Sequence, residues 1–248
     1  MSSQAPTGFI TSQGLPNPKL GDGLPAFARI GPRRDAYVNL VLPDFKTSAD
    51  EGSYFTGTNA TFGTGVAGPN TAAFSATSAI FTFLNKAGVG GPRTYLDYIR
   101  LIVSVTSAAA TGVQFGVVTD AIVRGSAGTP VTLVSPNQDA GVASNTQVLY
   151  TPTVAAASGS ARNVSRASGR TSAAPAIAVG DEYLLAFGSV EKAGGSLIYA
   201  ATVAGRFVIP MPPVILGPGS VQSAVIHAWF PNIAAAASFE FEVGLLER

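Results

Sequence analysis

The chain has 248 residues, of which 46% are hydrophobic and only 12% are charged, and its formal net charge is +1. This hydrophobic share is enough to build a sizeable core without disulfides, and the sparse charge indicates a surface that an assembly partly covers. Fifteen basic residues against fourteen acidic ones form no concentrated basic surface, so we expect no direct nucleic-acid binding.

The residue types that carry most metal and redox chemistry are nearly missing. There is no cysteine and only one histidine, which excludes thiolate nucleophiles, cysteine-bound zinc and histidine-rich metal sites. We therefore expect no cofactor and no metal. The N-terminal residues lack the basic and apolar regions of a secretory signal, and no stretch of about 18 apolar residues predicts a transmembrane helix, so we expect no membrane partner.

Residues 1–34 are interrupted by prolines at a spacing that excludes a helix and any long strand, and we expect an extended arm there. Two interpretations remain open: a solvated tail, or an arm that becomes ordered against a neighbouring subunit. In the second case the basic residues of the arm are candidates for docking to a partner. They are Lys19, Arg29, Arg33 and Arg34.

Residues 35–248 form the body of the protein, in which short β-type segments alternate with clusters of Gly, Pro, Asn and Ser, as is typical of a sandwich or barrel. The expected strands are 36–42, 78–84, 95–105, 113–119, 131–135, 146–150, 182–190, 205–211, 220–230 and 238–247. The last of these alternates most clearly, with Phe239, Phe241 and Val243 on one face and Glu240 and Glu242 on the other. Segments that are apolar on both faces are expected to be central strands, and together they predict an all-β, antiparallel two-layer sandwich.

Two stretches with little to bury, 46–77 and 154–180, are expected to be long loops that contact other subunits or a host surface. In the second stretch, Arg162, Arg166 and Arg170 follow one another at a spacing of four, which would align them on a helix. Because the surrounding residues are poor helix formers and include Gly169, the loop is favoured.

The carboxylates predict no catalytic site. Asp181 and Glu182 are neighbours, but neighbours in a strand point to opposite faces, so a turn is favoured over a dyad. Glu240 and Glu242 share a face and could in principle serve glycoside hydrolysis, but a solvated or interface face of a terminal strand is favoured. The motifs of serine hydrolases, phosphate-binding loops and zinc proteases are all missing, so we expect a non-enzymatic protein without catalytic residues.

The only histidine and the only tryptophan, His227 and Trp229, lie in the expected strand 220–230 and point to the same face of it. We expect this strand to form a hairpin with strand 238–247 through a short Ala-rich connection. We interpret His227 as a hydrogen-bonded structural residue and Trp229 as core or subunit-interface packing. Whether that face meets the second sheet or the next subunit is left open.

Four segments in chain order resemble a family of structural proteins from tailed bacteriophage virions. They are "YIRLIVSVTSAAATGVQFGVVTD" (98–120), "PVTLVSPNQDA" (130–140), "VGDEYLLAFGSV" (179–190) and "IPMPPVILGPGSVQSAVIHAWFPNIAAAASFEFEVGLLER" (209–248). The resemblance covers most of residues 95–248. It implies a jelly-roll-like sandwich on the head or tail of a virion, often as a symmetric oligomer, and it implies no catalytic residues.

We therefore expect a decoration, cement or minor capsid protein, located in the capsid or head–tail region of a virion. Its expected partners are further copies of itself, as a homotrimer, and the major capsid protein or other virion proteins. The alternative is a tail or head-fibre module that binds a host glycan, with Trp229 and Phe230 as an aromatic platform at a loop mouth. A third hypothesis, a glycan-cleaving enzyme, would require Glu240 or Glu242 for activity.

Overall fold

The structure is a computed structural model. It describes residues 52–106, 112–170, 177–188, 205–219 and 222–248, together with residues 29–30, 36–37 and 49. The chain divides into two units, Met1–Leu42 and Pro43–Arg248. In the first unit, β1 (Arg29–Ile30) pairs antiparallel with β2 (Ala36–Tyr37). Of the four basic residues expected to dock a partner, Arg29 lies in β1, whereas Lys19, Arg33 and Arg34 lie outside the described residues, so the docking arm stays a prediction.

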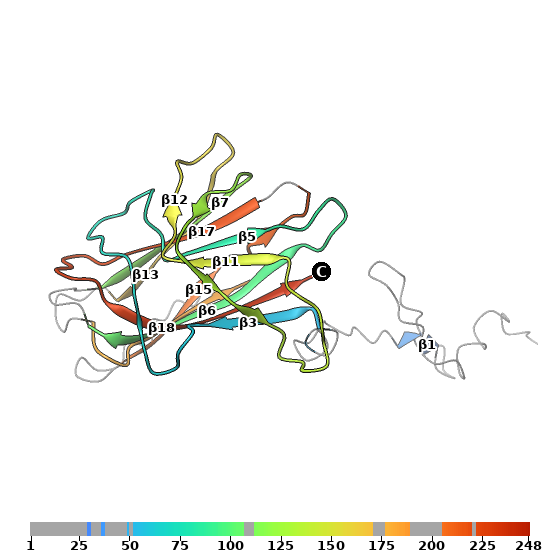
Figure 1. Ribbon diagram of the computed structural model, residues 1–248, viewed down its shortest axis with the longest axis horizontal. Helices are drawn as coiled ribbons and strands as arrows, with labels where there is room; N and C mark the ends of the chain where they lie inside the picture. The colour runs from blue at the N-terminus through green and yellow to red at the C-terminus, as the bar shows by residue number, and fades with distance from the viewer. Residues whose placement is uncertain are drawn as a thin grey trace, which may run out of the picture. The chain divides into compact units, whose positions relative to one another are not determined.

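The second unit is a two-layer β-sandwich (Figure 1). Its larger sheet has the order β10-β3-β18-β6-β14-β15, with β16 paired to β6 and β4 paired to β18. These strands are β3 (Tyr54–Thr58), β4 (Val66–Ala67), β6 (Thr94–Val105), β10 (Leu133–Val134), β14 (Glu182–Phe187), β15 (Arg206–Met211), β16 (Ile215–Leu216) and β18 (Ser238–Glu247). Every pair in it is antiparallel except β14 with β15.

The smaller sheet is wholly antiparallel and has the order β13-β7-β17-β5-β11-β9. Its strands are β5 (Phe81–Asn85), β7 (Val113–Asp120), β9 (Thr129–Val131), β11 (Thr146–Tyr150), β13 (Arg162–Arg170) and β17 (Gln222–Trp229). A separate two-stranded ribbon pairs β8 (Gly125–Ser126) with β12 (Thr153–Val154). No helix of the described residues is long and apolar enough to cross a membrane.

The core lies between the two sheets and is built by the period of two that the sequence shows. In β18, Phe239, Phe241 and Val243 are buried in the main hydrophobic cluster, while Glu240 and Glu242 lie on the opposite face. Phe241 meets the smaller sheet, with ring centroids 5.1 Å from Phe81. The burial of each such aromatic side chain contributes about 1.5–3 kcal/mol. Together with the two sheets of the strand order, this confirms the all-β, two-layer sandwich.

The expected hairpin between the last two long strands is wrong. Both edges of β17 are taken within the smaller sheet, by β5 and β7, and β18 lies in the larger sheet between β3 and β6. The connection turns at Asn232, which has φ of 60°, and then carries the chain to the other layer. Phe230 and Phe239 stack there with centroids 5.7 Å apart, so apolar packing across the sandwich replaces hydrogen bonding between neighbours.

Both stretches expected to be loops contain strands. Stretch 46–77 includes β3 and β4, and stretch 154–180 includes the nine-residue β13, which pairs with β7 along its length. The glycine that favoured a loop has a packing role instead. A Cβ on Gly169 would lie 2.7 Å from Cδ1 of Tyr183, so this position of the strand accepts only a residue without a side chain.

Candidate ligand-binding groove

His227 and Trp229 point away from the larger sheet, on the outer face of the smaller one. The alternate residues of β17, which are Ala224, Ile226 and Ala228, point inward and belong to the main core. Val225, on the same face as His227 and Trp229, packs in a separate small cluster with Ala79 and Val154. His227 and Trp229 are 1% and 7% exposed. This face does not meet the second sheet, because residues 71–78 of the same chain contact it; contact with another subunit stays a prediction.

Residues 71–78 are tied to β17 at both ends. The backbone N–H of Phe230 donates to the carbonyl of Thr71 at 2.8 Å. At the other end, Nδ1 of His227 lies 2.7 Å from the carbonyl oxygen of Ser78 and must be the donor, because a carbonyl only accepts. The His227 side chain is thus hydrogen-bonded through Nδ1 to the segment that covers it.

Strand register places two rows of side chains across the outer face of the smaller sheet. One row runs from Arg166 on β13 through Gly116 on β7 to His227 on β17. In the next row, Gln114 of β7 lies beside Trp229. Gly116 leaves a gap in the centre of its row, where an added Cβ would lie 3.5 Å from Cζ3 of Trp229. Because Gly116 has no side chain, the surface is hollowed there and forms the floor of a groove.

The groove has a volume of about 710 Å³ and lies between residues 72–74 and strand β13. Phe74 forms one wall, with its ring edge-on to both His227 and Trp229 at centroid distances of 5.0 and 5.5 Å. The Phe74 side chain is 53% exposed, which is unusual for a large aromatic residue. An apolar wall therefore faces the open side of the groove.

Arg166 forms the opposite wall and is held by two contacts. Its guanidinium carbon lies 5.7 Å from the centre of the Trp229 ring, and its Nη2 donates to Oε1 of Gln114 at 3.0 Å. A cation over an indole face gains about 0.5–1 kcal/mol at an exposed site. None of the described residues that line the groove is Asp or Glu, and Arg166 brings a positive charge to it.

Comparison with protein-family models, curated proteins and solved structures finds no match for this chain.

The aromatic platform expected from Trp229 and Phe230 is not the one observed. Phe230 is fully buried on the other face of the strand, where it stacks with Phe239. Phe74 takes its place beside Trp229. The sequence offered no signal for this, because Phe74 lies in a Gly- and Ala-rich stretch and reaches Trp229 only through the folding of residues 71–78.

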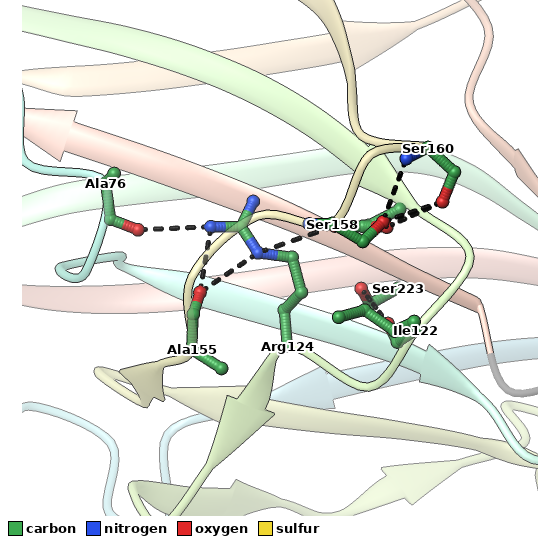
Figure 2. Close-up of polar contacts among 8 residues, drawn as sticks. Ala76, Ile122, Arg124, Ala155, Ser158, Ser160 and Ser223 are labelled. Carbon is green, nitrogen blue, oxygen red and sulfur yellow. Dashed lines mark hydrogen bonds and ion pairs between the residues drawn. The ribbon is translucent and has the colours of Figure 1, made fainter.

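A buried ion pair beneath the same covering segment was also missed. Arg124 lies 3.8 Å from Asp120, and neither side chain is exposed. Figure 2 shows Arg124 donating to the carbonyls of Ala76 and Ala155. Burial on its own would raise the pKa of Asp120, but hydrogen bonds from Ser158 and Ser160 outweigh it and hold that pKa below its usual value. The pair thus connects the covering segment at Ala76 with the loop that contains Ala155, Ser158 and Ser160.

The carboxylates considered for catalysis lie elsewhere, on the outer face of the larger sheet. Glu240 accepts the N–H of Gly63, and Glu242 accepts the hydroxyl of Tyr98 and lies 3.7 Å from Arg100. Arg100 also binds Glu182 at 2.9 Å. Glu242 and Glu182 are therefore both paired with Arg100, whereas Glu240 accepts a backbone N–H.

Asp181 behaves differently from its neighbour Glu182. Its carboxylate is fully buried and accepts the backbone N–H groups of Ala178 and Gly205. The two neighbours therefore form no dyad. Within the described part of the chain, no group of three or more His, Cys, Asp or Glu residues is arranged to hold a metal ion.

Proposed function

We propose that this chain is a non-enzymatic structural protein of a virion, acting as a decoration, cement or minor capsid protein in the capsid or head–tail region. The observation that carries the proposal is how the buried acidic side chains are used. Asp120, Asp181 and Glu247 each accept hydrogen bonds from backbone N–H groups of the loops beside them, donated by Ser158, Gly205 and Asn145. Acidic groups that accept such hydrogen bonds hold the neighbouring loops in place. None of the three lines the groove.

The exposed apolar side chains of the sandwich support contacts with neighbouring subunits. Phe62, Val89, Val208 and Ile215 are all exposed. Covering such residues favours association, and closed symmetric oligomers are the usual outcome for identical chains. A homotrimer that also contacts the major capsid protein is the assembly we propose.

Two measurements test the structural role. Light scattering of the purified protein should give three times the mass of one chain, and residues 1–34 should resist protease when the protein is bound to particles but not when it is free. A monomer at all accessible concentrations would contradict the trimer. An arm cleaved equally in both states would contradict bridging through residues 1–34.

The groove supports a second candidate function, binding of a glycan on a host surface. The specific observation is the half-exposed ring of Phe74 beside polar groups of Gln114, Asn163 and Arg166. Sugars are bound by stacking their apolar faces on aromatic rings while planar polar side chains take their hydroxyls. A glycan array probed with the wild-type protein and with Phe74→Ala tests it. Binding that is unchanged by the substitution would place the sugar elsewhere.

A further inference from the structure

Arg166 is positioned as a receptor for a carboxylate. Its guanidinium is steadied on one side by the Trp229 ring and by one hydrogen bond to Gln114, and the side chain remains exposed. The remaining N–H groups of a guanidinium form a planar fork that matches the two oxygens of a carboxylate. Because the fork is already held in place, less side-chain entropy is lost when a ligand binds.

Arg166 has no acidic partner among the residues that the structure describes. No ion pair of Arg166 occurs within the described ranges, and the nearest acidic residue of β7, Asp120, is committed to Arg124, Ser158 and Ser160. A neutral ligand would form no ion pair with the Arg166 guanidinium. Charge complementarity therefore favours an anionic ligand over a neutral one.

The rest of the groove favours a sugar ring over a peptide. Phe74 offers an exposed aromatic face, Gly116 leaves the floor open, and Asn163 and Ser165 offer polar groups at the rim. A peptide that extends a sheet pairs with the edge of a strand, whereas this groove lies on the face of the sheet across β13, β7 and β17. The aromatic wall and open floor thus suit a sugar ring, and Arg166 suits an acidic group on that ring.

We propose that the groove binds a carboxylate-bearing sugar, such as a sialic or uronic acid residue. Arg166 takes the carboxylate through paired hydrogen bonds, and Phe74 stacks against the sugar ring. The inference rests on the groove being a glycan site, and it adds the charge class of the sugar and the residue that selects it.

The test compares matched sugars by calorimetry and by saturation-transfer NMR on the full chain. Sialyllactose is paired with lactose, and glucuronic acid with glucose. We expect the acidic member of each pair to bind about 10- to 100-fold more tightly than the neutral one. Arg166→Gln should remove this preference, and Arg166→Lys should keep only part of it because an ammonium lacks the planar fork.

A matched control lies on the same strand. Arg162 is exposed on β13 but does not line the groove, so Arg162→Gln makes the same change of charge and should leave the preference intact. If Arg162→Gln weakens binding as much as Arg166→Gln does, general charge attraction is responsible and the proposal is overturned. An unchanged melting temperature and NMR spectrum for each variant establishes that its fold is intact.

The failures of the two proposals are distinguishable. Equal binding of acidic and neutral sugars, lost in Phe74→Ala but kept in Arg166→Gln, overturns the acidic specificity and leaves the glycan function standing. Binding of neither sugar overturns both. Binding of an oligoglutamate peptide that depends on Arg166, without binding of any sugar, also overturns both and assigns the groove to an acidic peptide.

Discussion

Arg124 and Asp120 form an ion pair of 3.8 Å in which neither side chain reaches solvent. Nη1 of Arg124 has no hydrogen-bond partner among the described residues, while Nη2 and Nε reach carbonyls of two separate loops. Removing one member of a buried pair leaves the other as an uncompensated charge, which typically costs about 3–5 kcal/mol. The pair is thus a stability determinant that can be tested directly.

Arg124→Met should lower the free energy of unfolding by about 3–5 kcal/mol in urea denaturation. Combining it with Asp120→Asn should cost less than the sum of the two single substitutions, because the double variant buries no lone charge. The control is Arg206→Gln, which removes an exposed partner of Glu182 at 3.1 Å and should cost at most about 1 kcal/mol. Equal losses for Arg124→Met and Arg206→Gln would contradict a buried role.

His227, the only histidine, should make the free energy of unfolding depend on pH below about 6.5. Burial lowers the pKa of His227 below 6.5, nearby Arg124 lowers it further, and backbone hydrogen bonds with Ser78 and Ser75 oppose the shift. Between the folded pKa and 6.5 the unfolded chain binds more protons, so the free energy of unfolding rises with pH in that interval. Stability is complete above about pH 6.5 and is lost as pH falls through the folded pKa.

His227→Gln should make the free energy of unfolding nearly constant over that interval, whereas the wild type loses stability. Denaturation at about pH 7.5 and pH 5.5 measures this, and the NMR titration of the single imidazole gives the folded pKa directly. A wild-type imidazole that titrates at or above 6.5 would contradict the assignment.

Glu247 provides the corresponding signal for a carboxylate at the end of β18. Burial would raise its pKa, but hydrogen bonds from Ser144, Asn145 and Thr146 outweigh burial and bring the pKa below 4.5. Its contribution to stability is present above about pH 4.5 and is lost as pH falls through the folded pKa. Glu247→Gln should cost about 1–3 kcal/mol at neutral pH, since an amide group would face N–H donors.

The loss of stability between about pH 5 and pH 3 should therefore be smaller in Glu247→Gln than in the wild type. Acid denaturation followed by circular dichroism compares the two. Parallel curves would indicate that the carboxylate is not held by these hydrogen bonds.

Phe74→Ala tests the covering of Trp229. Loss of two edge-on ring contacts should reduce the free energy of unfolding by about 0.5–1.5 kcal/mol for each contact. Because Trp229 is the only tryptophan, its fluorescence should shift to longer wavelength as water reaches the ring. Val142→Ala, at a side chain that is 58% exposed and is not among the residues proposed for subunit contacts, should change neither quantity. An unshifted emission in Phe74→Ala would show that Phe74 does not shield the indole.

Gly169→Ala tests the close approach between β13 and the larger sheet. The new methyl group would lie 2.7 Å from the fully buried Tyr183 ring, and such overpacking costs about 1–3 kcal/mol. Gly159→Ala is the control, because nothing lies within 4 Å of its added Cβ. Similar thermal unfolding of the two variants would contradict close packing at Gly169.

The strands that alternate between apolar and polar residues could be predicted from the sequence. The faces of β18 are those its sequence indicates, since Phe239, Phe241 and Val243 have no other means of leaving water. β13 could not be found this way, because its arginines, serines and glycines carry little apolar signal and its stability comes from pairing with β7. The period alone does not determine which strands pair, which is why the predicted hairpin of β17 with β18 is wrong.

The groove depended on contacts between distant parts of the chain. His227 and Trp229 were located on one face of one strand, but Phe74 and Arg166 reach them only after three strands and a covering segment come together. A lone phenylalanine among alanines and an arginine in a Ser-rich stretch give no sign of this in the sequence. Such sites are set by register, which composition does not encode.

The place of β18 between β3 and β6 has a consequence for synthesis on the ribosome. The larger sheet cannot be completed until residues 238–247 have been synthesised. Until then, the edges of β3 and β6 that β18 occupies in the folded protein remain unpaired, while nearly all of the body is being translated. Exposed edges of this kind attract other nascent chains, and pairing across such sequence separation is slow. Recombinant yield should therefore depend strongly on temperature and on chaperone supply during expression.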